Sequence, residues 1–148
     1  MRNHESLTYT NQLGESLVFS YTSTFCPQKI EGLSDVRSTV YSINSMGQSG
    51  DTFVAARIES RDVDISGVIR ERAPEQIRAH RRMLARILNP QLSATLTYSY
   101  GPFVRVIGCR SVNAPEITKS ARDVYHHFSV QLVCLNPFWR EATETRSD

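Results

Sequence analysis

Residues 61–90 read RDVDISGVIRERAPEQIRAHRRMLARILNP, a strand pattern followed by a helix pattern. In the strand part, two sets of residues alternate, as in a strand with one buried face: Val63, Ile65, Gly67 and Ile69 on one side and Asp62, Asp64, Ser66 and Arg70 on the other. The helix part begins at Pro74, which suits a first helical turn, and contains no glycine as far as Leu88. Pro90 cannot continue a helix. This stretch therefore predicts one strand and one helix, residues 74–88.

The predicted helix has two unlike faces. On a helical wheel the apolar residues form one stripe, made by Ile77, Leu84, Ile87 and Leu88. The other side carries a row of arginines: Arg78, Arg82 and Arg86. We expect the apolar residues to anchor the helix on a sheet, with His80 packing at the edge of the stripe.

The rest of the chain is strand-like, so the expected fold class is mainly β (α+β). Alternating runs and turn residues bound further strands near 7–10, 16–19, 36–43, 53–59, 94–100, 103–112 and 124–135. Residues 21–33 contain Pro27 and Gly32 and predict an irregular crossing segment. About eight strands and one flanking helix predict a β-sandwich.

The end of the sequence predicts an anchored aromatic pair and a polar tail. Phe138 and Trp139 directly follow a strand and Pro137, and burial of two large aromatic side chains is strongly favourable. We expect residues 1–140 to form one domain and residues 141–148 a polar C-terminal tail.

Composition narrows the function classes. The 148 residues are 40% hydrophobic and 22% charged, with a net charge of +2, as in an ordinary globular domain. No apolar run approaches the roughly 20 residues of a membrane span, and residues 1–10 are not a secretory signal. We expect synthesis in the cytoplasm and no contact with a membrane.

The sequence contains no recognisable catalytic or metal motif. Phosphate-loop and dinucleotide-binding fingerprints are missing, and residues 47–50 (GQSG) lack the glycine spacing of a nucleophile elbow. Three widely spaced cysteines predict free thiols, two of them buried: Cys26, Cys109 and Cys134. His126 and His127 are adjacent on a strand and point to opposite faces, so we expect one in the core and one in solvent. The sequence predicts no enzyme, no cofactor and no metal site.

Charge is concentrated before and within the helix. Between residues 70 and 86 there are six arginines and two glutamates. This arginine face, Arg78, Arg82 and Arg86, could bind phosphate, pair with acidic residues of another subunit, or be solvated. Asp62 and Asp64, on one face of a strand, could bind a cation, be solvated, or pair with arginines of a neighbouring chain.

Residues 44–51 form a polar, glycine-bearing tip between two strands. We expect either an arm that reaches the next subunit or a mobile hairpin tip. The candidate contact residues there are Asn44, Met46, Gln48 and Asp51.

The order of these features resembles the N-terminal domain of the distal tail protein family of long-tailed bacteriophages and phage-tail-like particles. The resemblance covers nearly the whole chain and rests on a hairpin at 7–19, IEGL at 30–33, RDVDISGVI at 61–69, RRML at 81–84, NP at 89–90, FSVQL at 128–132 and NPFW at 136–139. The combination of the strand RxVxIxG with the NPFW ending is the more specific part.

The resemblance implies a tail-tube-like β-sandwich that assembles as a homohexameric ring in the virion tail tip. Such a ring joins the tail tube protein to tip, baseplate hub or receptor-binding proteins, and it is structural. Family members usually continue past NPFW into a C-terminal domain, which we expect to be absent from this sequence. The alternative function is a small nucleic-acid-binding β-domain that uses the arginine-rich helix, although aromatic residues for base stacking are missing nearby.

Overall fold

The computed structural model describes residues 5–33, 38–43, 47, 50, 52–71, 73–118 and 126–141, with the backbone alone for 38–43 and 52–58. These residues form eleven strands and one helix. In chain order they are β1 (Glu5–Asn11), β2 (Ser16–Ser20), β3 (Phe25–Glu31), β4 (Ser38–Ile43), β5 (Thr52–Ile58), β6 (Arg61–Ile69), α1 (Pro74–Ile87), β7 (Ser93–Tyr100), β8 (Phe103–Ser111), β9 (Glu116–Thr118), β10 (His126–Cys134) and β11 (Arg140–Glu141).

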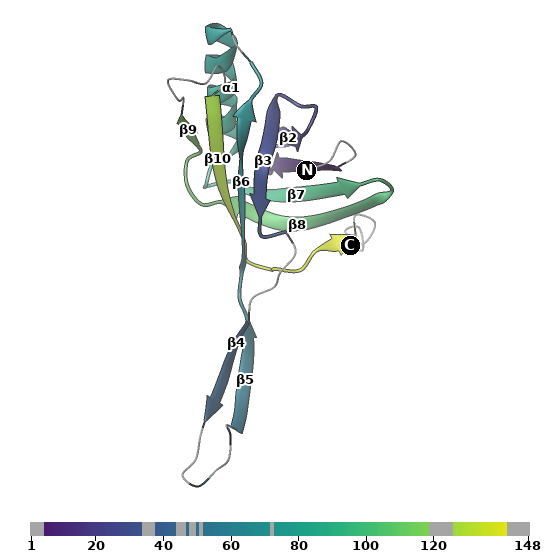
Figure 1. Cartoon of the computed structure of the whole chain (residues 1–148), viewed down its shortest axis with the longest axis vertical. Helices are drawn as coiled ribbons and strands as arrows, with labels where there is room; N and C mark the ends of the chain where they lie inside the picture. Colours follow the sequence, from purple (N-terminus) through teal and green to yellow (C-terminus); the bar gives the residue numbers. More distant parts are fainter. Residues whose placement is uncertain are drawn as a thin grey trace.

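The main sheet curls into a closed barrel (Figure 1). Its strand order is β11-β8-β7-β1-β2-β3-β6-β10-β9, and β10 also pairs with β8. The seven strands from β8 round to β10 therefore close on themselves, with β9 and β11 added outside the ring of strands. The expected class, mainly β with one helix, is correct, but the expected sandwich is not. Inward and outward residues alternate along a strand in both architectures, so the alternation does not distinguish them.

The predicted hairpin at 7–19 and the predicted strand ahead of the helix are both present. β1 pairs with β2 in an antiparallel register. In β6, Val63, Ile65 and Ile69 are buried while Asp62 and Asp64 are exposed, as the alternation predicted.

The segment expected to be irregular contains a strand, β3, with a proline inside it. Pro27 is tolerated because β3 pairs with β2 at a single position, Phe19 opposite Phe25, and has a register shift between Pro27 and Lys29 on its β6 side. Gly67 on β6 faces this irregularity, and a Cβ atom there would lie 2.1 Å from the Cys26 carbonyl oxygen. Because Gly67 has no side chain, the backbones of β3 and β6 can approach closely at this point.

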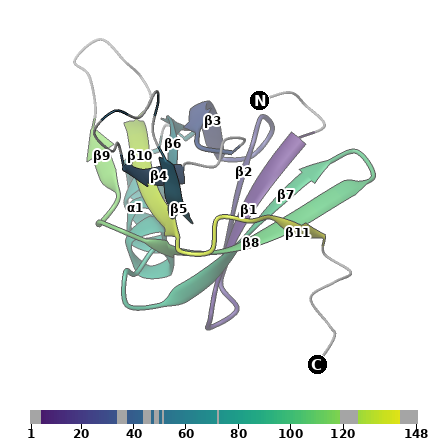
Figure 2. The same ribbon diagram turned by 90° about the horizontal axis from the view of Figure 1, so that it is seen from below.

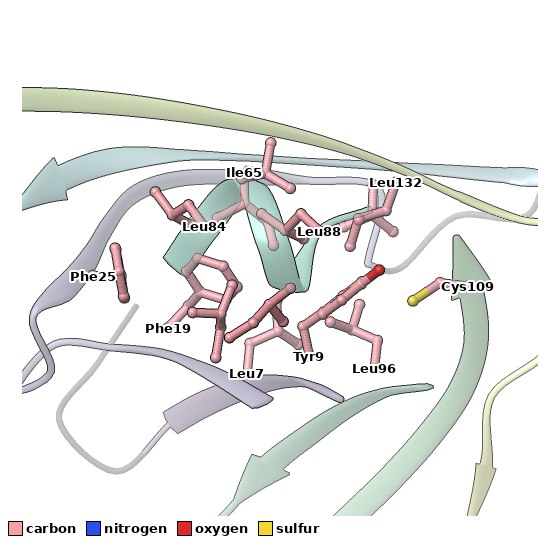
Figure 3. Close-up of a cluster of buried hydrophobic side chains, with 14 of the residues drawn as sticks. Leu7, Tyr9, Phe19, Phe25, Ile65, Leu84, Leu88, Leu96, Cys109 and Leu132 are labelled. Carbon is pink, nitrogen blue, oxygen red and sulfur yellow. The ribbon is translucent and has the colours of Figure 1, made fainter. Parts of the chain in front are cut away.

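Helix α1 packs on the barrel core through the predicted stripe. Ile77, Leu84, Ile87 and Leu88 are all buried, and Figure 3 shows Leu84 and Leu88 among the core side chains of the strands. The helix ends at Ile87, one residue earlier than predicted, and the Leu88 N–H donates to the Leu84 carbonyl at 2.9 Å. His80 packs edge-on against Phe25, with ring centroids 5.7 Å apart.

We expect Leu84→Ala to lower the free energy of unfolding by about 2–5 kcal/mol, because Leu84 is fully buried and its loss leaves a cavity. Urea unfolding followed by circular dichroism measures the change. Ala85→Ser on the exposed side of α1 is the matched control and should change stability by less than about 1 kcal/mol. Equal stabilities of Leu84→Ala and the wild type would refute this packing.

Strands β4 and β5 do not join the barrel. They form an antiparallel two-stranded sheet of their own, which projects from the barrel as a long arm (Figure 1) and is seen end-on in Figure 2. The sequence correctly predicted two strands here but wrongly assigned them to the sandwich. Alternation marks a strand without stating which sheet it joins.

In the described part of the chain, no helix has the length and apolar character needed to cross a bilayer.

Candidate functional site

The candidate contact residues lie on separate parts of the chain, and the arm, β4 with β5, is the part that projects from the barrel (Figure 1). The predicted contact residues at its tip, Asn44, Met46, Gln48 and Asp51, lie outside the described residues. Gly47 and Gly50 are described there; both are exposed and have φ values of +80° and +90°. This left-handed conformation favours glycine and is typical of a hairpin turn.

The arm base is held by one buried arginine. Arg61 is only 5% exposed, although it carries a full charge. Its Nη1 donates to the Gly32 carbonyl oxygen at 2.8 Å, and its Nε donates to the Pro137 carbonyl oxygen at 3.0 Å. A buried charge must be compensated by such bonds. Arg61 thus joins the segment before the arm and the segment after β10 to the first residue of β6.

A tryptophan makes the second connection at the arm base. The Trp139 Nε1–H donates to the Leu33 carbonyl oxygen at 3.1 Å, and its ring packs edge-on against Tyr98. We define the base clamp as Gly32, Leu33, Arg61, Pro137 and Trp139. Through the clamp, the residues before the arm (Gly32 and Leu33) and after it (Arg61) are hydrogen-bonded to one another or to the segment that follows β10.

Gly32 allows the clamp to close. Its φ is +92°, and a Cβ atom built there would lie 1.9 Å from the Asp62 carbonyl oxygen. Such a contact is far inside van der Waals distance, so no side chain fits without backbone movement.

Phe138 differs from the expectation that both aromatic residues are anchored. Trp139 is half-buried, but the Phe138 side chain is 51% exposed. Pro137 is buried instead, and its carbonyl oxygen accepts from the Arg61 Nε–H. Phe138, which lies between Pro137 and Trp139, points outward. The anchored pair is Pro137 and Trp139.

The arginine face lies on the exposed side of α1. Arg78, Arg82 and Arg86 are all exposed. Arg86 is already paired within the chain, because its Nε lies 2.8 Å from the Glu15 Oε2. Among the described carboxylates, none lies within ion-pair distance of Arg78 or Arg82, so these two guanidinium groups are available to a partner.

The candidate acids lie elsewhere. Asp62 and Asp64 are exposed on β6, near the arm base, while α1 lies toward the opposite end of the barrel (Figure 1). One chain therefore does not bring the arginine face and the two acids together. They can meet only between copies of the chain.

An open hollow next to the base clamp was not anticipated from the sequence. It has a volume of about 530 Å³ and is lined by Leu33, Tyr98, Tyr100, Phe103, Arg105 and Trp139. Phe103 is 65% exposed at its rim. Tyr98 and Tyr100 alternate along β7, and Phe103 begins β8, but this pattern alone does not indicate an outer, solvent-facing surface.

The described residues do not include a group of three His, Cys, Asp or Glu side chains that could hold a metal ion. His126 and His127 are both half-buried, contrary to the expected division between core and solvent. The three cysteines are free thiols, and Cys109 and Cys134 are buried as expected.

Comparisons with known proteins find similar domains among phage tail proteins. A family model described as the phage tail protein RIFT-related domain matches residues 12–134. The Dit protein of phage SPP1, described as a paradigm of the hub adsorption apparatus in phages that infect Gram-positive bacteria, has a similar fold, with a TM-score of 0.69 and 15% identity over 91% of this chain. The match covers 52% of the Dit chain, so this chain spans about half of its length.

The SPP1 tail tube protein is also similar in fold, with a TM-score of 0.51 and 6% identity over 95% of this chain and 78% of that one. Among curated proteins, the sequence has no match.

Proposed function

The chain belongs to the phage tail protein RIFT-related domain family, and on this basis we propose that it is a structural ring subunit of a phage tail tip. In this proposal six copies form a homohexameric ring that joins the tail tube above to tip, baseplate and receptor-binding proteins below. The subunit acts as a distal tail protein and has no catalytic role.

The observation that carries the proposal is the arm. A two-stranded hairpin alone is at best marginally stable in water, because it cannot bury a face of its own. The β4–β5 sheet has no strand pairing with the barrel among the described residues. A neighbouring subunit that covers the arm would supply the missing burial. The base clamp would fix the direction in which the arm leaves the barrel.

Two further surfaces support a head-to-tail interface. The arginine face and the pair Asp62 and Asp64 have opposite charge and lie on different parts of one chain. A heterologous contact of this kind generates a ring when the rotation closes. Charged residues at the rim of such an interface set the register and the rate of association.

The similarity in fold to other phage tail proteins supports a position of the ring at the end of the tail tube. The chain shares its fold with the Dit protein and the tail tube protein of one phage, SPP1. A ring subunit with a tube-like fold can stack on a tube of related subunits, which suits a position between the tube and the tip.

Light scattering after size-exclusion chromatography, with class-averaged electron micrographs, tests the proposal. We expect a closed particle with six-fold symmetry. A protein that stays monomeric at high concentration, with no partner added, would contradict the ring. Steeply salt-dependent DNA binding by that monomer would instead favour the nucleic-acid-binding alternative.

Reversal of the arginine face, with Arg78, Arg82 and Arg86 all changed to glutamate, should abolish assembly and leave the fold intact. Like charges would then face any acidic partner surface, at a cost of several kcal/mol in association. Circular dichroism reports the fold, and light scattering reports the mass.

Arg86→Glu alone is the matched control, because it breaks the intrachain pair with Glu15 and places a second carboxylate beside it, while Arg78 and Arg82 remain available to a partner. A further variant adds Asp62→Arg and Asp64→Arg to the triple reversal and should restore assembly if the two surfaces pair. A triple variant that still forms the wild-type ring would exclude the arginine face from the interface.

A further inference from the structure

The barrel is closed by a short strand pairing. β10 and β8 are paired at two positions, Leu132 opposite Ser111 and Val133 opposite Arg110. By contrast, β10 pairs with β6 along its whole length. We call this short pairing between β8 and β10 the seam.

The register of the seam places two cysteines opposite each other. Because the strands are antiparallel, one further step along the same register sets Cys134 of β10 against Cys109 of β8. Both side chains are buried, and so are Leu132 and Ser111, the opposed pair two positions away on the same face. The two thiols therefore face the same interior at the end of the seam.

We infer that Cys109 and Cys134 are a disulfide-forming pair that can close the seam covalently. Directly opposed residues of an antiparallel pair have Cα atoms about 4.5–5.5 Å apart. A disulfide requires a Cα separation of about 4.4–6.8 Å, so the register suits the bond without a change of pairing. The pairing of these two cysteines is not evident from the sequence alone, because they are 25 positions apart and belong to an odd set of three.

The oxidant in this proposal is a low-molecular-weight disulfide, which acts by thiol–disulfide exchange. One cysteine thiolate attacks a sulfur of the small disulfide, forms a mixed disulfide and releases one small thiol. The other cysteine then attacks the protein sulfur of the mixed disulfide. The S–S bond between Cys109 and Cys134 forms, and a second small thiol leaves. The protein loses two protons and two electrons, which the small disulfide takes up.

The surroundings of the pair keep the thiols reduced until the seam opens. Burial raises the pKa of Cys109 to about 12 and that of Cys134 to about 11, so the reactive thiolate is scarce at neutral pH. Figure 3 shows Cys109 within the core, beside Tyr9 and Leu96. The bond should consequently form while the barrel closes during folding, or under conditions that loosen it.

The experiment refolds the reduced full chain from denaturant in a mixture of reduced and oxidised glutathione. Free thiols are then alkylated under denaturing conditions, and the protein is cleaved with trypsin. Cys109 and Cys134 fall in the separate tryptic peptides 106–110 and 123–140, while Cys26 falls in a third. We expect a dominant linked species of the first two peptides. The linked protein should melt roughly 5–10 °C higher than the reduced protein.

Cys26→Ser is the control that should retain both the link and the thermal shift. Cys109→Ala should fold, as judged by circular dichroism, and should lose both. Refolded protein in which both seam cysteines are alkylated, or in which links to Cys26 dominate, would overturn the inference. A link that forms and lowers the melting temperature would overturn it as well, because the bond would then not fit the native seam.

Discussion

Gly32→Ala is expected to lower the free energy of unfolding by about 3–5 kcal/mol. The new Cβ would lie 1.9 Å from the Asp62 carbonyl oxygen and 3.2 Å from the Val63 Cα, so the backbone of β6 must move. The φ value of +92° adds the strain of a left-handed conformation in a residue with a side chain. Overpacking against backbone and backbone strain each contribute roughly 1–3 kcal/mol.

Gly14→Ala separates the two contributions. Gly14 has a similar φ of +87°, but its Cβ would meet no atom within 4 Å. This variant should lose only the conformational part, about 1–2 kcal/mol. Urea unfolding of both variants against the wild type gives the comparison. Equal losses at Gly14 and Gly32 would show that the close approach to β6 contributes nothing, and the base clamp would then lose its main support.

The predictable parts of the fold are those where periodicity and burial agree locally. The helix from Pro74 has an apolar stripe wide enough to identify its buried face, and β6 alternates without interruption. β3 was missed because Pro27 argues against a strand, and only the single pairing with β2 and the shifted register with β6 make it acceptable. Whether strands form a barrel or a sandwich depends on contacts far apart in sequence, such as the seam.

The exposed residues of the candidate site could be predicted from the sequence, whereas the roles of its buried residues could not. A row of arginines on a helix is visible in the sequence, whereas the role of Arg61 is not. Its two carbonyl partners lie 29 and 76 positions away, and carbonyl groups carry no sequence signal. The same holds for Phe138 and Trp139, adjacent aromatic residues that differ in burial because Pro137 occupies the interior position.

Removal of the arm is expected to abolish ring assembly while the barrel remains folded. The register of β3 and β6 pairs Glu31 with Asp64, so the two strands already form a hairpin whose open end is occupied by the arm. Residues 34–60 can therefore be replaced by a short turn centred on Asn-Gly, which favours a tight connection between antiparallel strands. The core residues that the structure describes all lie outside the deleted segment.

Because the core is kept, the armless variant should keep the far-ultraviolet circular dichroism expected of the barrel and unfold within about 1–2 kcal/mol of the wild type. Its mass by light scattering should be that of a monomer. A second variant, with residues 44–51 alone replaced by Asn-Gly, keeps β4 and β5 and serves as the matched control. If the faces of the arm strands make the contact, this control assembles; if the tip makes it, both variants are monomeric. An armless protein that still forms a six-fold ring would show that the hairpin is dispensable, and the interface would have to be sought on the barrel itself.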